Sequence, residues 1–102
     1  MTNDEKIEQM QVELGEDYSP RELGVYLRKA KQKILNKRFP FGYLTEQEVE
    51  TQYEQLQIEL AIVLFNERGV EGQSHHNENG VHRTWRSVDE IMAEVVPYAS
   101  VI

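Results

Sequence analysis

The sequence predicts an all-α fold: a small bundle of about four helices with one long central helix, a glycine-rich polar loop and an extended C-terminal arm. Two observations lead to this prediction. Four segments place a Ser or Thr three residues before a Glu, which is the capping-box pattern of a helix start, and apolar residues then recur at helical spacing. The four pairs are Thr2 and Glu5, Ser19 and Glu22, Thr45 and Glu48, and Ser87 and Glu90.

The first two predicted helices have clear ends. The first begins at Thr2 and stops at Gly15, because glycine readily adopts the left-handed conformation that ends a helix. The second begins at Ser19, has Pro20 in its first position, and ends before Pro40. The expected inward stripe of the second helix is Leu23, Tyr26, Leu27, Ala30 and Ile34.

The third predicted helix is the longest. It runs from Thr45 to Arg68 after an aromatic turn at 39–44, whose rings either plug the end of a helix pair or anchor a partner. One face carries Val49, Tyr53, Leu56, Leu60, Val63 and Leu64, and nearly the opposite face carries Ile58, Ile62 and Phe65. A helix that is apolar on two sides must be covered on both, so either the first or fourth helix or a neighbouring subunit covers the second patch.

The C-terminal third combines a loop with a short helix. Residues 69–80 form a polar loop with three glycines, and residues 81–85 are expected to be extended, with a short β element near residue 83. The fourth helix begins at Ser87 and Pro97 stops it, which leaves a short apolar tail. The chain therefore divides into one helical domain at 1–96 and an arm at 97–102.

Charge is distributed unevenly along the chain. The formal net charge is -7, with 18 acidic residues against 11 Lys and Arg. Residues 19–38 carry seven bases and one acid, whereas the segments before and after are acidic. An acidic protein is not the usual binder of phosphates, but alternating segments suit head-to-tail contact between identical copies.

Composition narrows the class of protein. Apolar residues make up 39% of the chain, enough for a modest core, and no apolar stretch approaches the ~20 residues that span a bilayer. Cysteine is absent, so disulfides and thiolate chemistry are excluded. The acidic, polar N-terminal residues are not typical of a signal or transit peptide, which favours an intracellular protein or a particle assembled inside a cell.

Neither an enzyme nor a cofactor site is indicated. His75, His76, Glu78 and His82 are residue types that bind metals, but neighbouring histidines do not easily share one ion, and a solvent-facing loop is the favoured interpretation. The glycines are not spaced as in a phosphate-binding loop. The sequence thus predicts no catalytic residue, no metal and no cofactor. A small helical DNA-binding or regulatory protein stays open as an alternative, because the second helix is basic.

The run 61–74, followed by 78–81 and 83–85, resembles the small head-tail connector (adaptor) proteins of long-tailed double-stranded DNA bacteriophages. In that family a long helix ends in Gly, a Gly-, Ser- and Glu-rich loop leads to a short extended piece, and a capped terminal helix follows. The short acidic helix, the Lys-rich helix and the aromatic turn upstream are also similar. The resemblance covers almost the whole chain.

The resemblance implies a structural virion protein in the neck at the capsid vertex, assembled in the host cytoplasm. Such proteins form a ring, usually of twelve copies, under the portal protein. The ring continues the DNA channel, touches the double-stranded DNA without sequence specificity, and offers a surface to a stopper or tail-completion protein. No membrane is involved.

Two sets of site residues follow from these interpretations. The subunit interface is expected to combine the apolar patch Ile58, Ile62 and Phe65 with the basic residues Arg28, Lys29 and Lys33. The basic helix of one copy would face an acidic surface on the first or third helix of the next. In the arm, Tyr98, Val101 and Ile102 are expected to dock on the portal.

Overall fold

The computed structural model describes residues 1–43, 47–67 and 85–98. Its elements, in chain order, are α1 (Asn3–Leu14), α2 (Pro20–Arg38), the 3₁₀ turn η1 (Thr51–Tyr53), α3 (Glu54–Glu67) and α4 (Val88–Met92). The described parts contain no strand. The prediction of a small all-α bundle is confirmed. The loop at 69–80 and the expected β element near residue 83 lie outside the described residues.

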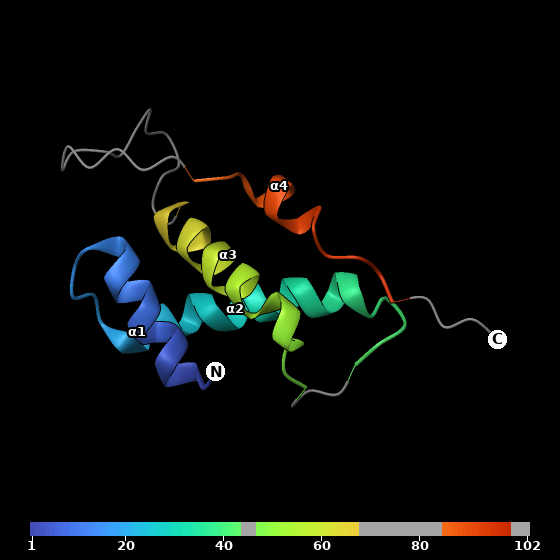
Figure 1. Cartoon of the computed structure of the whole chain (residues 1–102), viewed down its shortest axis with the longest axis horizontal. Helices are drawn as coiled ribbons and strands as arrows, with labels where there is room; N and C mark the ends of the chain where they lie inside the picture. The colour runs from blue at the N-terminus through green and yellow to red at the C-terminus, as the bar shows by residue number, and fades with distance from the viewer. Residues whose placement is uncertain (44–46, 68–84, 99–102) are drawn as a thin grey trace.

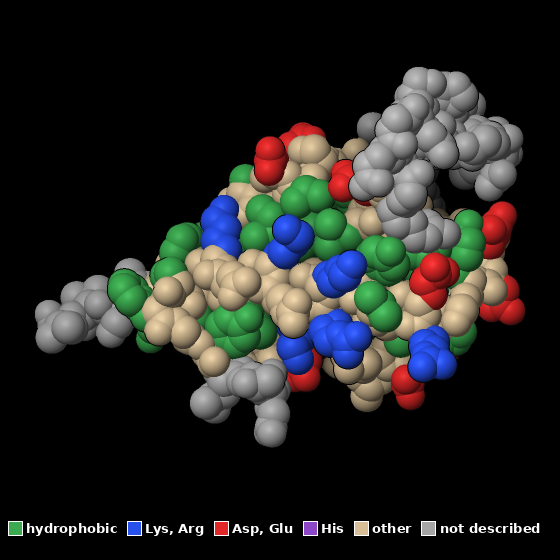
Figure 2. Space-filling view, turned by 180° about the vertical axis from the view of Figure 1, so that it is seen from behind, with side chains coloured by type: hydrophobic (Ala, Val, Ile, Leu, Met, Phe, Trp, Pro, Cys, Tyr) green, Lys and Arg blue, Asp and Glu red, His purple; other side chains and the backbone are tan. Residues whose placement is uncertain are grey.

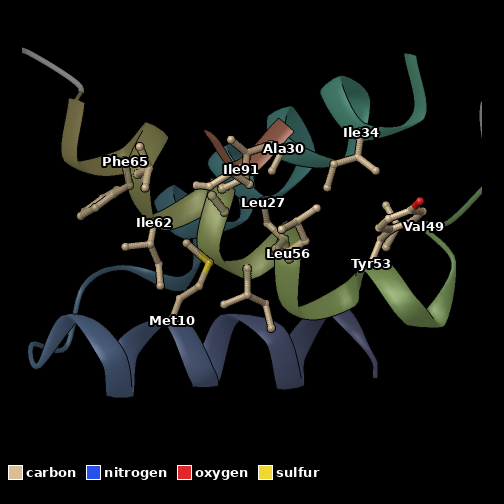
Figure 3. Close-up of a cluster of buried hydrophobic side chains, with 14 of the residues drawn as sticks. Met10, Leu27, Ala30, Ile34, Val49, Tyr53, Leu56, Ile62, Phe65 and Ile91 are labelled. Carbon is tan, nitrogen blue, oxygen red and sulfur yellow. The ribbon is translucent and has the colours of Figure 1, made fainter. Parts of the chain in front are cut away.

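Helix α3 is the centre of the bundle. It contacts α1, α2 and α4, and in Figure 1 it lies in front of α2, with α1 and α4 on its two sides. Figure 3 shows side chains from these helices converging around it, among them Met10, Leu27 and Ile91. Because other helices cover most of its circumference, α3 can be apolar on nearly every side.

The predicted helix starts at Thr2, Ser19 and Ser87 are confirmed. The Thr2 and Ser87 side chains each accept a hydrogen bond from the backbone N–H three residues on, and the side chain of the Glu there accepts one from the backbone N–H of the cap residue. Ser19 likewise accepts from the N–H of Glu22. Gly15 ends α1 with a φ of 75°, a conformation that costs a residue with a Cβ more than it costs glycine.

The predicted start of the third helix is wrong. Residues 47–50 are not helical, and regular α-helix begins only at Glu54, after η1. Tertiary contacts outweigh the local capping pattern here. Glu50 accepts hydrogen bonds of 2.6 and 3.2 Å from Arg38, and Val49 is buried in the core. The third helix is therefore 14 residues long rather than a rod reaching back to residue 45.

The fourth helix is also shorter than predicted, because α4 ends at Met92 and the chain returns toward α2. Arg38 donates to the Val96 carbonyl, the Val96 N–H donates to the Tyr53 hydroxyl, and the Tyr98 N–H donates to the Arg38 carbonyl at 2.6 Å. These bonds hold residues 95–98 in a non-helical path against the end of α2. No described helix is long and apolar enough to cross a bilayer.

Candidate subunit interface

The seven cations of α2 fall into two groups. Three of them turn toward the rest of the chain: Lys31 pairs with Glu48 at 3.2 Å, Lys37 donates to the Met92 carbonyl at 2.6 Å, and Arg38 pairs with Glu50. The other four are exposed and have no carboxylate within 4 Å among the described residues. They are Arg21, Arg28, Lys29 and Lys33, called the basic face below.

Helical geometry places these four cations together. At 100° per residue, Arg21 and Arg28 lie along one flank of the exposed side and Lys29 and Lys33 along the other. Lys29 also lies 5.0 Å from the centre of the Tyr26 ring, a distance typical of a cation–π contact. Figure 2, which shows the opposite side of the molecule from Figure 1, has Lys and Arg side chains following one another across the surface.

A pocket of about 300 Å³ lies between α1, α3 and the segment 85–94. Its lining comes from those elements and from Gln52 in η1, and no described residue of α2 contributes to it. The lining residues are Glu13, Gln52, Gln55, Leu56, Glu59, Trp85, Arg86 and Glu94, called the acidic pocket below. Among the described residues that line the pocket, three carboxylates stand against one guanidinium, so their formal charges sum to -2.

Arg86 organises the carboxylates of the acidic pocket. Its guanidinium donates to both oxygens of Glu59, at 2.6 and 2.8 Å, and to Glu94. The hydrogen bonds to Glu59 and then to Glu94 raise the pKa of Arg86 further above its usual range. Next to this cluster, Gln9 on α1 donates to Glu13 at 2.9 Å and to Gln55 at 2.8 Å. The side chains of the pocket are thus held by bonds within the chain.

The predicted apolar interface patch is wrong. Ile58, Ile62 and Phe65 are 1%, 0% and 1% exposed within the single chain. Phe65 packs edge-on against the rings of Tyr18 and Tyr26, at centroid distances of 4.8 and 5.6 Å. Ile62 faces α1 beside Met10 (Figure 3). Of the two ways to cover the second apolar side of α3, the chain's own fold is the one observed.

The predicted portal-docking residues are only partly described. Tyr98 is 52% exposed, and its ring lies 5.8 Å from that of Phe39 and 5.3 Å from the Arg38 guanidinium. Val101 and Ile102 lie outside the described residues. In the aromatic turn, Phe39 and Tyr43 pack against the core, as the plug interpretation expects, whereas Phe41 is 91% exposed.

The histidine-containing loop also lies outside the described residues, so the structure gives no geometry for His75, His76 or His82. Within the described parts, no three potential metal-ligating side chains of the His, Cys, Asp or Glu type come together.

Sequence reasoning located the basic face but did not find the acidic pocket. Arg28, Lys29 and Lys33 are exposed, as an interface requires. The pocket brings together residues as distant as Glu13 and Glu94, and no spacing in the sequence indicates that encounter. Comparison with known proteins adds no relative, since no protein-family model, curated protein or solved structure matches the chain.

Proposed function

We propose that this chain is a structural protein that joins head to tail with copies of itself into a ring, and that the ring serves as a head-tail connector in a phage neck. The observation that carries the proposal is the unpaired basic face of α2, on the other side of α3 from the acidic pocket. Four exposed cations without a described carboxylate partner call for an anionic surface from elsewhere.

The identity of the ring rests on the family resemblance. By that resemblance the partners are the portal protein, a stopper or tail-completion protein, and the DNA of the channel. The ring would lie in the neck of the virion. The arm from Pro97 onward would reach the portal, and the Tyr98 ring within it is half exposed.

Self-assembly is tested by sedimentation velocity of the purified chain over a wide range of protein concentration, at low and at high salt, with negative-stain microscopy of the heaviest fraction. We expect rings at low salt and dissociation as salt screens the charged contacts. A chain that stays at 12.0 kDa under every condition contradicts the proposal.

Two variants test whether assembly depends on the charge of the basic face or on the exposed side of α2 in general. Lys29→Glu/Lys33→Glu should prevent ring formation, whereas Gln32→Ala, on the same exposed side of α2, should leave it intact. Circular dichroism confirms that both variants are folded. Rings of unchanged stability from the double variant would show that the basic face is not in the contact.

The phage setting has a test of its own. Genes for a portal, a protease and a major capsid protein upstream of the coding sequence are expected. If the chain forms rings but is encoded among unrelated genes, the proposal of self-assembly stands and the proposal of a phage connector is wrong.

The basic face also favours a second candidate, a small DNA-binding protein, because exposed Lys and Arg on one helix suit phosphates. Fluorescence anisotropy with a labelled duplex discriminates the two. Strong, salt-sensitive duplex binding by a chain that sediments as a monomer favours the DNA binder. Rings with weak duplex affinity favour the connector.

A further inference from the structure

We propose that the acidic pocket is the surface that receives the basic face of α2 from the next copy of the chain. This inference rests on the proposed function and makes it specific, because it names the second half of the contact. The occupant is a second copy of this chain, chosen by charge complementarity between two surfaces that every copy carries.

The first argument is charge. Glu13, Glu59 and Glu94 supply three carboxylates to the pocket, and Arg86 neutralises only part of them. Gln52 and Gln55 add amide oxygens that accept hydrogen bonds. The basic face brings two guanidinium groups and two ammonium groups, all donors. The pocket therefore offers negative charge and hydrogen-bond acceptors, and the basic face offers positive charge and hydrogen-bond donors.

The second argument is position. Helix α2 lies behind α3 in Figure 1, and Figure 2, seen from behind, has Lys and Arg side chains on that side of the molecule, whereas the pocket is lined by α1, η1, α3 and residues 85–94. A contact between two different surfaces is heterologous: each copy binds one neighbour with α2 and another with its pocket. Such contacts give rings when the rotation per copy closes and filaments when it does not.

The third argument is preorganisation. Glu59 and Glu94 are already held by Arg86, and Gln55 is held by Gln9, so little side-chain freedom is lost when a neighbour docks. Individual exposed ion pairs contribute little free energy. Several of them repeated around a ring fix the register between copies and make assembly sensitive to salt.

The test uses two full-length variants with opposite charge changes. The first, Arg28→Glu/Lys29→Glu/Lys33→Glu, leaves one cation against three carboxylates and so makes the basic face acidic. The second, Glu13→Gln/Gln52→Lys/Gln55→Lys, leaves two carboxylates against three cations among the described lining residues, with the two new ammonium groups at exposed positions and the Arg86 bonds in place. Each variant alone presents like charges across the contact and should stay monomeric.

Mixed in equal amounts, the two variants should assemble again. The acidic α2 of the first then meets the basic pocket of the second, and the unchanged α2 of the second meets the unchanged pocket of the first. Assemblies that contain both variants in a one-to-one ratio, measured by native mass spectrometry, are the expected result. A mixture in which both variants stay monomeric overturns the inference.

The matched control changes net charge equally at a different surface. Glu8→Lys/Val12→Lys also raises the net charge by three, at exposed positions on α1 that do not line the pocket, and should assemble like the wild type. If this variant is blocked while Glu13→Gln/Gln52→Lys/Gln55→Lys assembles, the outer side of α1 is the receiving surface and the inference is wrong. In that case the proposed function still stands. If the wild type itself is monomeric, both the proposed function and this inference are wrong.

Discussion

Lys6 is 2% exposed, although a lysine is rarely buried completely. Its ammonium group donates to the Gln57 side-chain oxygen at 2.6 Å and lies 3.8 Å from Glu54, and the Gln57 amide donates to the Leu27 carbonyl at 3.1 Å. This chain of bonds joins α1, α3 and α2. No buried side-chain nitrogen or oxygen in the described residues lacks a hydrogen-bond partner.

Replacing only Lys6 or only Gln57 should lower the free energy of unfolding more than replacing both side chains together. Gln57→Leu leaves a buried ammonium group poorly paired and should lower the free energy of unfolding by about 3–5 kcal/mol. Lys6→Met leaves a neutral amide oxygen unpaired and should cost about 1–3 kcal/mol. The double variant should be close to the wild type, since both partners become apolar. Urea denaturation measures all three, and additive losses would contradict the account.

The buried amine also gives a pH dependence. Burial lowers the pKa of Lys6 below its ordinary 10.5, against the smaller opposing effects of Glu54 and Glu48. In the interval just below 10.5 the unfolded chain then holds more protons than the folded chain, so the contribution of Lys6 to stability rises with pH there. The stability of the wild type relative to Lys6→Met should therefore increase as the pH rises toward 10.5. A gap in unfolding free energy that narrows with pH would show that Lys6 is not buried as a cation.

At the residue scale, the sequence predicts caps better than burial. Thr2, Ser19 and Ser87 act locally, through a backbone N–H three residues away, so a short pattern is enough. Lys6 lies four residues before Met10, on the inward side of α1, but its charge argues for an exposed position. Lys6 can be buried because Gln57, 51 residues later in the chain, accepts a hydrogen bond from its ammonium group.

At the scale of the element, the sequence leaves open whether the chain itself or a neighbouring subunit covers the second apolar side of α3, and the chain's own fold covers it. An acid at its buried positions should therefore unfold the protein rather than only prevent assembly. Ile62→Asp places a charge at a fully buried site and should abolish cooperative thermal unfolding and most of the helical signal in circular dichroism. Gln55→Asp, an exposed position on the same helix, is the control. An Ile62→Asp protein that is folded but monomeric would contradict this, and would indicate that Ile62 lies in the subunit interface.

The end of α2 holds the C-terminal segment through Arg38. Its guanidinium lies 5.7 Å from the Tyr53 ring and 5.3 Å from the Tyr98 ring, in addition to its bonds to Glu50 and Val96. Arg38→Met should release residues 95–98, which amide hydrogen exchange reports as faster exchange at Val96 and Tyr98 while the α3 amides stay protected. Asn36→Met, at an exposed position on α2, should change neither. Unchanged exchange in Arg38→Met would mean that the segment is held by other contacts.

Elements with local signals were predictable, and those defined by distant contacts were not. The ends of α1 and α2 follow from Gly15, Pro20 and Pro40. The late start of α3 depends on Arg38 reaching Glu50, and the early end of α4 depends on the return of the chain to α2. Neither contact has a signature in the residues at the helix end itself.

At the scale of the whole molecule, the all-α class was predictable and the arrangement around α3 was not. Hydrophobic periodicity shows that α3 needs cover on two sides, but it does not say whether the cover comes from α1 and α4 or from another copy. The same limit applies to the interface. The four cations of the basic face belong to a segment whose seven cations are visible in the sequence, whereas the acidic pocket exists only once distant segments have packed together.

The chain has no cysteine, so a disulfide between two introduced cysteines reports one chosen contact. Gln32→Cys lies on the exposed side of α2 among the cations, and Gln55→Cys lies in the acidic pocket. Under mild oxidation the double variant should give a ladder of covalent multimers on a non-reducing gel, while each single variant stays monomeric, because only head-to-tail contact brings residue 32 of one copy to residue 55 of the next. A double variant that stays monomeric, or a Gln32→Cys single variant that dimerises as readily, would contradict the account.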